Sequence, residues 1–159
     1  MKKKVQLSSY CLIVSALSLA VLCGVFVYIL KQSGNGVAVW LLVIALAFPL
    51  LSTLFYMPLS VELTDGSLKI KKILKTRSIP LSEISEVRLC PPTMGAIRIC
   101  GSGGLFGWYG WFREGDLGKY FAYYGKASDC FLVTLRDGRK YMLGCEDAPQ
   151  MAEAIKKKL

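Results

Sequence analysis

The chain has 159 residues, a formal net charge of +9 and a hydrophobic fraction of 53%, and nearly every residue from 10 to 56 is apolar. The remaining stretch of about 100 residues has the composition of a soluble protein and can bury one small core. Histidine is absent, which excludes the usual Ser-His and Cys-His nucleophile pairs, so we expect no enzyme.

Residues 1–9 form a basic tail that begins with Lys2, Lys3 and Lys4. Together with Lys156, Lys157 and Lys158 near the other end and the lysines of the domain, they suit a surface that faces anionic phospholipid. Nucleic acid would fit the charge as well. A domain tethered to the membrane meets lipid head groups first, so we expect anionic lipid as a partner and no nucleic acid.

Two apolar runs, 10–30 and 37–56, contain no charged residue. Each supplies roughly 20 residues, enough at about 1.5 Å per residue to cross a hydrocarbon core of about 30 Å. The polar stretch 31–36 between them is too short for anything but an antiparallel turn. The sequence therefore predicts a transmembrane helical hairpin over 10–56.

Small residues recur at spacing four in the first run, at Ala16, Ala20 and Gly24. Such a stripe lets a second helix approach closely, although small residues are also common in membrane helices in general.

The distribution of lysine and arginine near the segment ends predicts the orientation. Three lysines precede the first run, one lies in the turn, and Lys69, Lys71 and Lys72 follow the second run. The positive-inside rule then places both termini in the cytoplasm, in a multi-pass protein. A cleaved signal peptide is the alternative for the first run, but that run is longer than the usual apolar region and lacks a clean small-x-small site.

Residues 57–159 predict a small α+β domain. Residues 59–63 alternate between apolar and polar, and Asp65-Gly66 then marks a hairpin turn. Further strands are expected at 68–73, 84–89, 97–99, 120–124, 130–135 and 140–143, and a helix at 149–159, with Asp147 as its N-cap and Ala152, Ile155 and Leu159 on one face. Six or seven antiparallel strands and a C-terminal helix are the element order of a pleckstrin-homology (PH)-like barrel or sandwich capped by that helix.

Four segments carry a resemblance to the bacterial PH-domain proteins, in which two N-terminal helices precede a PH-like domain: VELTDGSLKIKK, IPLSEISEVRLC, RICGSGGLFGWYGWFREGDLGKYFAYYG and FLVTLRDGRKYMLGCED. The resemblance covers nearly the whole chain, and the glycine-aromatic segment is its most specific part. It implies a PH-like fold at the bacterial inner membrane and no catalysis.

The glycine-aromatic segment lacks the spacing of a phosphate loop. One interpretation is a bulged barrel edge, where glycines allow positive φ and aromatic rings fill the barrel. The other is an amphipathic loop whose aromatics lie at head-group level or against a partner helix, with Arg113 reaching phosphate. The residues of this membrane or partner loop would be Gly104, Phe106, Gly107, Trp108, Tyr109, Gly110, Trp111, Phe112 and Arg113.

A basic cluster lies around an early strand-to-strand connection of the domain. Its members are Lys69, Lys71, Lys72, Lys75 and Arg77. The resemblance to PH domains implies that such residues contact lipid phosphate. The alternative is a solvated strand face on which lysines protect a sheet edge.

The six cysteines form no CxxC pair, so a zinc site would need thiolates from scattered positions, and we expect neither a metal site nor a cofactor. The predicted function is non-catalytic binding or scaffolding at the membrane surface, through lipid, another membrane protein or self-association. The alternative function is that of an accessory subunit in a membrane enzyme or transport complex.

Overall fold

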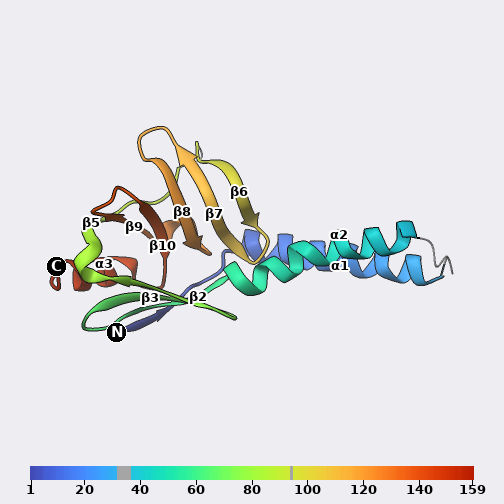
Figure 1. Cartoon of the computed structure of the whole chain (residues 1–159), viewed down its shortest axis with the longest axis horizontal. Helices are drawn as coiled ribbons and strands as arrows, with labels where there is room; N and C mark the ends of the chain where they lie inside the picture. Colours follow the sequence, from blue (N-terminus) through green and yellow to red (C-terminus); the bar gives the residue numbers. More distant parts are fainter. Residues whose placement is uncertain (32–36, 94) are drawn as a thin grey trace.

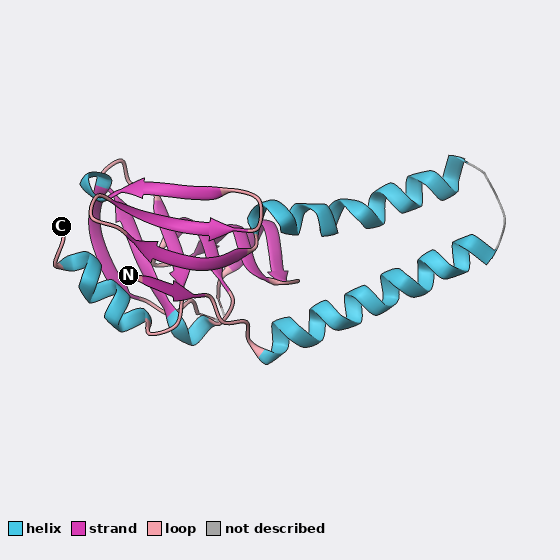
Figure 2. Ribbon diagram, turned by 90° about the horizontal axis from the view of Figure 1, so that it is seen from below, coloured by secondary structure: helices cyan, strands magenta, loops and turns pink. Residues whose placement is uncertain are grey.

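Two long helices extend from a β-rich domain in the computed structural model, which describes residues 1–31, 37–93 and 95–159 (Figure 1). The helices are α1 (Ser9–Lys31) and α2 (Val37–Tyr56), and both leave the domain in the same direction (Figure 2). Residues 32–36 of the predicted turn lie outside the described residues.

One helix of the described chain, Ser9–Ile29 within α1, is long and apolar enough to cross a membrane. A second apolar stretch, Trp40–Thr53 within α2, is shorter. The large apolar side chains of Ile13, Leu17 and Val21 are more than half exposed, at 59%, 61% and 63%, which sets α1 apart from the core helix of a soluble protein. The structure thus shows one helix of spanning length, and the two-helix span stays a prediction.

Within the described part of the chain, the small-residue stripe of α1 does not lie in a close contact with another helix. Ala16, Ala20 and Gly24 are all exposed. A Cβ atom added to Gly24 would meet no atom of the described chain within 4 Å. The stripe is thus open in the described part of the chain, and its role in helix packing stays a prediction.

The domain consists of two sheets and a C-terminal helix. The first sheet has the order β1-β2-β3-β4, with β1 (Lys2–Lys4), β2 (Pro58–Leu63), β3 (Ser67–Lys72) and β4 (Thr76–Pro80). The second has the order β5-β9-β10-β8-β7-β6, with β5 (Ile84–Leu89), β6 (Ile97–Gly104), β7 (Gly107–Glu114), β8 (Gly118–Tyr124), β9 (Cys130–Leu135) and β10 (Lys140–Gly144). Short 3₁₀ turns, η1 (Leu81–Glu83) and η2 (Ala127–Asp129), precede β5 and β9.

The core lies between the sheets and is closed by α3 (Ala148–Lys156), whose Met151, Ala152 and Ile155 are buried. Leu159, which we expected on this buried face, lies beyond the helix end and is 54% exposed. The α+β class with a C-terminal helix is confirmed.

One strand pair departs from the predicted antiparallel arrangement, because β10 pairs parallel with β8. The short η2 connection reverses the chain between β8 and β9 but leaves room for one strand between them. The β9–β10 hairpin places β10 in that position, where its direction must match that of β8. The sheet is therefore mixed.

The N-terminal residues form part of the domain. Residues 2–4, expected in a tail, form β1 on the edge of β2, and Val5 N–H donates to the Leu59 carbonyl at 2.9 Å. On the other side, Glu146 N–H donates to the Lys4 carbonyl at 2.8 Å. Removing this segment by cleavage would strip a strand from the first sheet.

Asp147 occupies the N-cap position of α3 but caps nothing with its side chain in the described structure. Its φ of 52° is left-handed, and its carboxylate lies 2.7 Å from Lys3 Nζ. The predicted cap is thus replaced by an ion pair to β1, since the N-terminal strand brings a cation to this point.

The glycine-aromatic segment is a β-hairpin of β6 and β7 at the edge of the second sheet, with a bulge between Arg98 and Cys100. This agrees with the bulged-edge interpretation, and contact of the segment with the membrane or a partner stays a prediction. Gly101 and Gly110 face each other across the strands, with φ of 133° and 120°. A Cβ atom on Gly110 would lie 2.2 Å from the Cys100 carbonyl oxygen, so only glycine lets the two backbones approach.

Gly110→Ala should lower the free energy of unfolding by about 2 kcal/mol or more, because the methyl group collides with backbone and the left-handed φ is strained. The measurement is urea unfolding of the full chain in nonionic detergent, followed by near-ultraviolet circular dichroism. Gly115→Ala is the control, since a Cβ there meets nothing within 4 Å in the described structure. Equal stability of the two variants would contradict the close approach.

Candidate functional site

The last residue of α2 stacks on the domain. The Tyr56 ring lies 6.3 Å from the Tyr109 ring, with 9° between their planes, and 6.5 Å from the Phe121 ring. Tyr109 belongs to β7 and Phe121 to β8. Aromatic stacking of this kind adds to the burial of the rings, so it fixes the end of α2 against the second sheet.

Two adjoining pockets lie along α2 and meet at Tyr56. They share Phe48, Ser52, Tyr56, Trp111 and Phe121 as walls. The glycine-side pocket, between α2 and the β6–β7 hairpin, has a volume of about 630 Å³. The basic pocket, between α2 and the β3–β4 side of the domain, has a volume of about 990 Å³.

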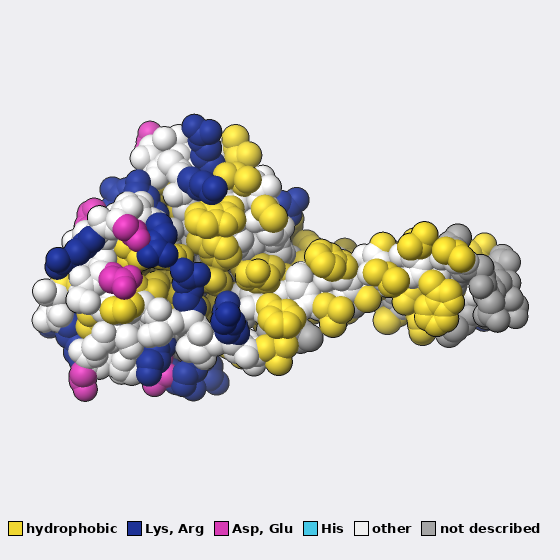
Figure 3. Space-filling model, viewed as in Figure 1, with side chains coloured by type: hydrophobic (Ala, Val, Ile, Leu, Met, Phe, Trp, Pro, Cys, Tyr) yellow, Lys and Arg dark blue, Asp and Glu magenta, His cyan; other side chains and the backbone are white. Residues whose placement is uncertain are grey.

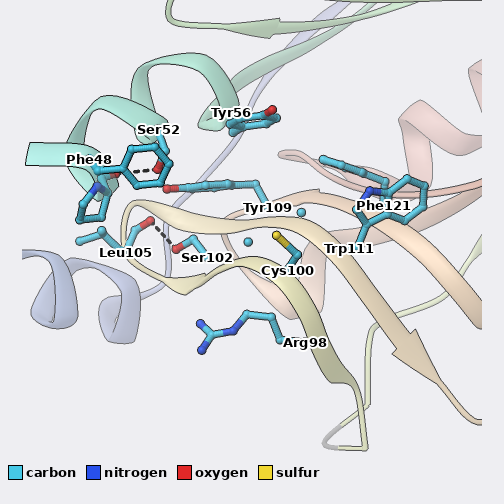
Figure 4. Close-up of a pocket in the computed structure, with 13 residues that line it drawn as sticks. Phe48, Ser52, Tyr56, Arg98, Cys100, Ser102, Leu105, Tyr109, Trp111 and Phe121 are labelled. Atoms are coloured by element: carbon cyan, nitrogen blue, oxygen red, sulfur yellow. Dashed lines mark hydrogen bonds between the residues drawn. The ribbon is translucent and has the colours of Figure 1, made fainter. Parts of the chain in front are cut away.

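The glycine-side pocket is largely apolar, with hydroxyl groups at its inner end (Figure 4). The Tyr109 side chain points towards α2, and the Ser102 hydroxyl donates to the Leu105 carbonyl at 2.9 Å. Burial raises the pKa of the Tyr109 hydroxyl, and hydrogen bonding to Ser102 and Ser52 opposes this in part. Tyr109 is therefore neutral at physiological pH, and Arg98 is the one charged side chain among the described residues that line this pocket.

The basic pocket places cations against aromatic rings. Lys72 Nζ lies 5.4 Å from the ring centroids of both Tyr56 and Tyr123. The Arg77 guanidinium carbon lies 4.8 Å from the centre of the Tyr141 ring, and this guanidinium also donates to the Tyr141 hydroxyl. These rings hold the two cations at the pocket wall without neutralising them.

The basic pocket has an unbalanced positive charge. Lys72, Lys75, Arg77 and Arg139 line it, and no carboxylate from the described part of the chain does. Of the four, Arg139 alone has an acidic partner among the described residues, Asp137. Burial, followed by repulsion from Arg77 and Lys75, lowers the pKa of the Lys72 ammonium. A bound anion would relieve this repulsion.

The structure divides the predicted basic cluster. Lys72, Lys75 and Arg77 lie in the basic pocket, whereas Lys69 and Lys71 lie on the outer side of β3, where Lys71 Nζ is 2.6 Å from Glu62. Strand alternation separates Lys71 from Lys72.

Sequence reasoning missed Arg139 and Tyr141, which come from the distant β9–β10 hairpin. The Asp137-Gly138 turn showed that hairpin, but nothing local showed that it would face β4.

The glycine-aromatic residues have mainly structural positions. Tyr109 and Phe112 are 4% and 0% exposed, and Trp108 stacks on Tyr124 with centroids 5.9 Å apart. Arg113 is exposed on β7. Trp111 is half-buried and lines both pockets, so within this set it has the clearest position for contact with a ligand.

The hairpin tip also meets α1. The Phe106 N–H donates to the Ser15 hydroxyl at 2.8 Å. Gly104 and Gly107, with φ of 129° and 114°, flank this tip, and a Cβ on Gly104 would lie 3.0 Å from the Tyr10 ring. Gly104 therefore lets the hairpin approach α1 closely, whereas Gly107 lies against the Tyr124 carbonyl and Leu7.

The described residues contain no cluster of three or more His, Cys, Asp or Glu side chains able to hold a metal ion. The arrangement can bind an elongated molecule that has an apolar part and an anionic part.

Comparison with known proteins identifies the family of this chain. A family model described as "Bacterial PH domain" matches residues 59–159. Searches of curated proteins and of solved structures gave no match. Since the matching model covers more than half of the chain, this chain belongs to the bacterial PH-domain family.

Proposed function

We propose that this chain is a membrane-anchored, non-catalytic PH-domain protein that binds an anionic phospholipid at the cytoplasmic face of the bacterial inner membrane. The observation that carries the proposal is the basic pocket, in which Lys72, Lys75 and Arg77 have no acidic partner among the described residues and lie beside the apolar helix α2. α1 and α2 span the membrane as a hairpin, with both termini in the cytoplasm.

The proposed membrane anchoring is supported by the apolar surface of the helices. Figure 3 shows hydrophobic side chains along the helices, whereas Lys and Arg gather on the domain. The domain follows α2 almost directly, because β2 begins at Pro58 and α2 ends at Tyr56. If α2 spans the bilayer, the basic pocket lies at the level of the lipid head groups.

The walls of the basic pocket match the two parts of a phospholipid. Phe48, Leu51 and Phe55 of α2 offer an apolar wall for an acyl chain. Lys72 and Arg77 offer charge to a phosphate at the domain end. A surface cation near anionic lipid contributes about 1 kcal/mol to the free energy of binding. The cations of this pocket are partly buried and held by tyrosine rings, which favours a defined binding site over diffuse attraction.

Loss of the pocket cations should weaken lipid binding. Lys72→Gln combined with Arg77→Gln should raise the Kd for phosphatidylglycerol about tenfold or more, because two head-group contacts disappear. The measurement is native mass spectrometry of the full chain in nonionic detergent, titrated with phosphatidylglycerol, with phosphatidylcholine and with glycerol phosphate. Only the first should bind tightly, since it alone supplies both a net negative charge and acyl chains.

Lys69→Gln combined with Lys71→Gln is the matched control. It removes the same formal charge, here from two positions on β3 outside the pocket, so the Kd should change by less than about twofold. Equal losses in the two double variants would show diffuse attraction and refute the pocket.

The proposed orientation has its own test. A green fluorescent protein fused after Leu159 should fluoresce in intact cells, because its chromophore matures in the cytoplasm but not after Sec-dependent export. Alkaline phosphatase at the same position should be inactive. The reverse pattern would refute the cytoplasmic placement of the domain.

A further inference from the structure

The β3–β4 turn carries two large apolar side chains in the open. Ile73 is 42% exposed and Leu74 is 59% exposed, and Lys72 and Lys75 flank them in sequence. The other end of β3 differs, because its turn contains Asp65 and Gly66, and the Asp65 carboxylate lies 2.6 Å from Lys158 Nζ. One end of this sheet is therefore apolar and cationic, and the opposite end is polar.

The apolar turn lies on the side of the domain from which the helices leave. β3 runs antiparallel to β2, and Lys72 is paired with Pro58, the first residue of β2 after α2. A strand advances about 3.3 Å per residue, so the residues after Lys72 continue past Pro58 to the level of the last turn of α2. The contact between Lys72 and the Tyr56 ring fixes this level, and Figure 1 shows the green hairpin ending towards the helices.

The chemistry of the turn matches the boundary between acyl chains and head groups. Exposed Leu and Ile side chains gain free energy when they leave water for the acyl region. The ammonium groups of flanking lysines can then reach anionic phosphates while their stems stay apolar. A single exposed apolar residue is normal on a protein surface and needs no explanation. Two adjacent ones do need an explanation when they lie at a turn, between cations and level with a membrane helix.

We infer that the β3–β4 turn inserts Ile73 and Leu74 into the surface of an anionic phospholipid bilayer, as a membrane contact separate from the helices. The inference rests on the proposed function, since it requires α2 to span the membrane. The basic pocket lies between α2 and this hairpin, with Lys75 and Thr76 on its wall. With α2 embedded on one side and the turn inserted on the other, the pocket opens onto lipid.

Photo-cross-linking of the full chain in phosphatidylglycerol-containing liposomes tests the inference. The photoreactive amino acid p-benzoylphenylalanine replaces Leu74, and lipid adducts are counted by mass spectrometry. Ile97, which is 69% exposed on β6, is the matched control. Ile44, 62% exposed in α2, is the control for the span. We expect about tenfold more adduct at position 74 than at position 97, and strong labelling at position 44.

The outcomes separate the two proposals. Labelling at position 44 without labelling at position 74 would overturn the inserted turn and leave the anchored protein intact. Equal labelling at positions 74 and 97 would also overturn it, because it would show no specific contact. If position 44 is unlabelled, the span and the inserted turn both fall. As a second variant, Leu74→Asp with the probe at Ile73 should reduce the adduct about tenfold, since the carboxylate opposes insertion.

Discussion

A single residue, Met57, separates the end of α2 from β2 of the PH domain. With so short a connection, the domain cannot turn freely relative to the helix, and the Tyr56 ring is pressed against Tyr109 and Phe121. The two pockets along α2 exist because of this contact. Their walls come partly from the helix and partly from the sheet, so neither part alone would form them.

The other helix is attached just as closely. The Cys11 thiol donates to the Gly125 carbonyl at 3.5 Å, and Ser15 accepts from the tip of the β6–β7 hairpin. Before α1, the chain pairs with β2 and reaches the start of α3. These contacts tie the helices, the N-terminal strand and both sheets together. A signal peptide removed after folding would not be expected to supply a strand and buried contacts to the mature domain.

Two hairpins of the domain, β6–β7 and β3–β4, lie on opposite sides of Tyr56 and contribute different side chains to the pockets along α2. The hairpin brings its aromatic rings close to α2 because glycines let its strands approach closely. The β3–β4 hairpin brings cations to the other side of Tyr56, where burial, followed by repulsion from Arg77 and Lys75, lowers the pKa of Lys72. The result is one groove along α2, with a largely apolar pocket that Arg98 also lines on one side of Tyr56 and the basic pocket on the other.

The sequence alone determined the apolar segments, most strands with their Asp-Gly turns and the C-terminal helix, because these depend on local composition and on periodicities of two or 3.6 residues. The family was indicated separately, by the resemblance of four segments to known proteins. The sequence also showed that lysines cluster around residue 72. Tertiary structure decided that residues 2–4 are a strand, that β10 pairs parallel with β8, and that Asp147 binds Lys3. It likewise decided which lysines face the pocket and that Arg139 joins them. Periodicity indicates which side of a strand is buried, but the neighbouring strand is chosen by contacts between residues far apart in sequence, and those contacts formed the site.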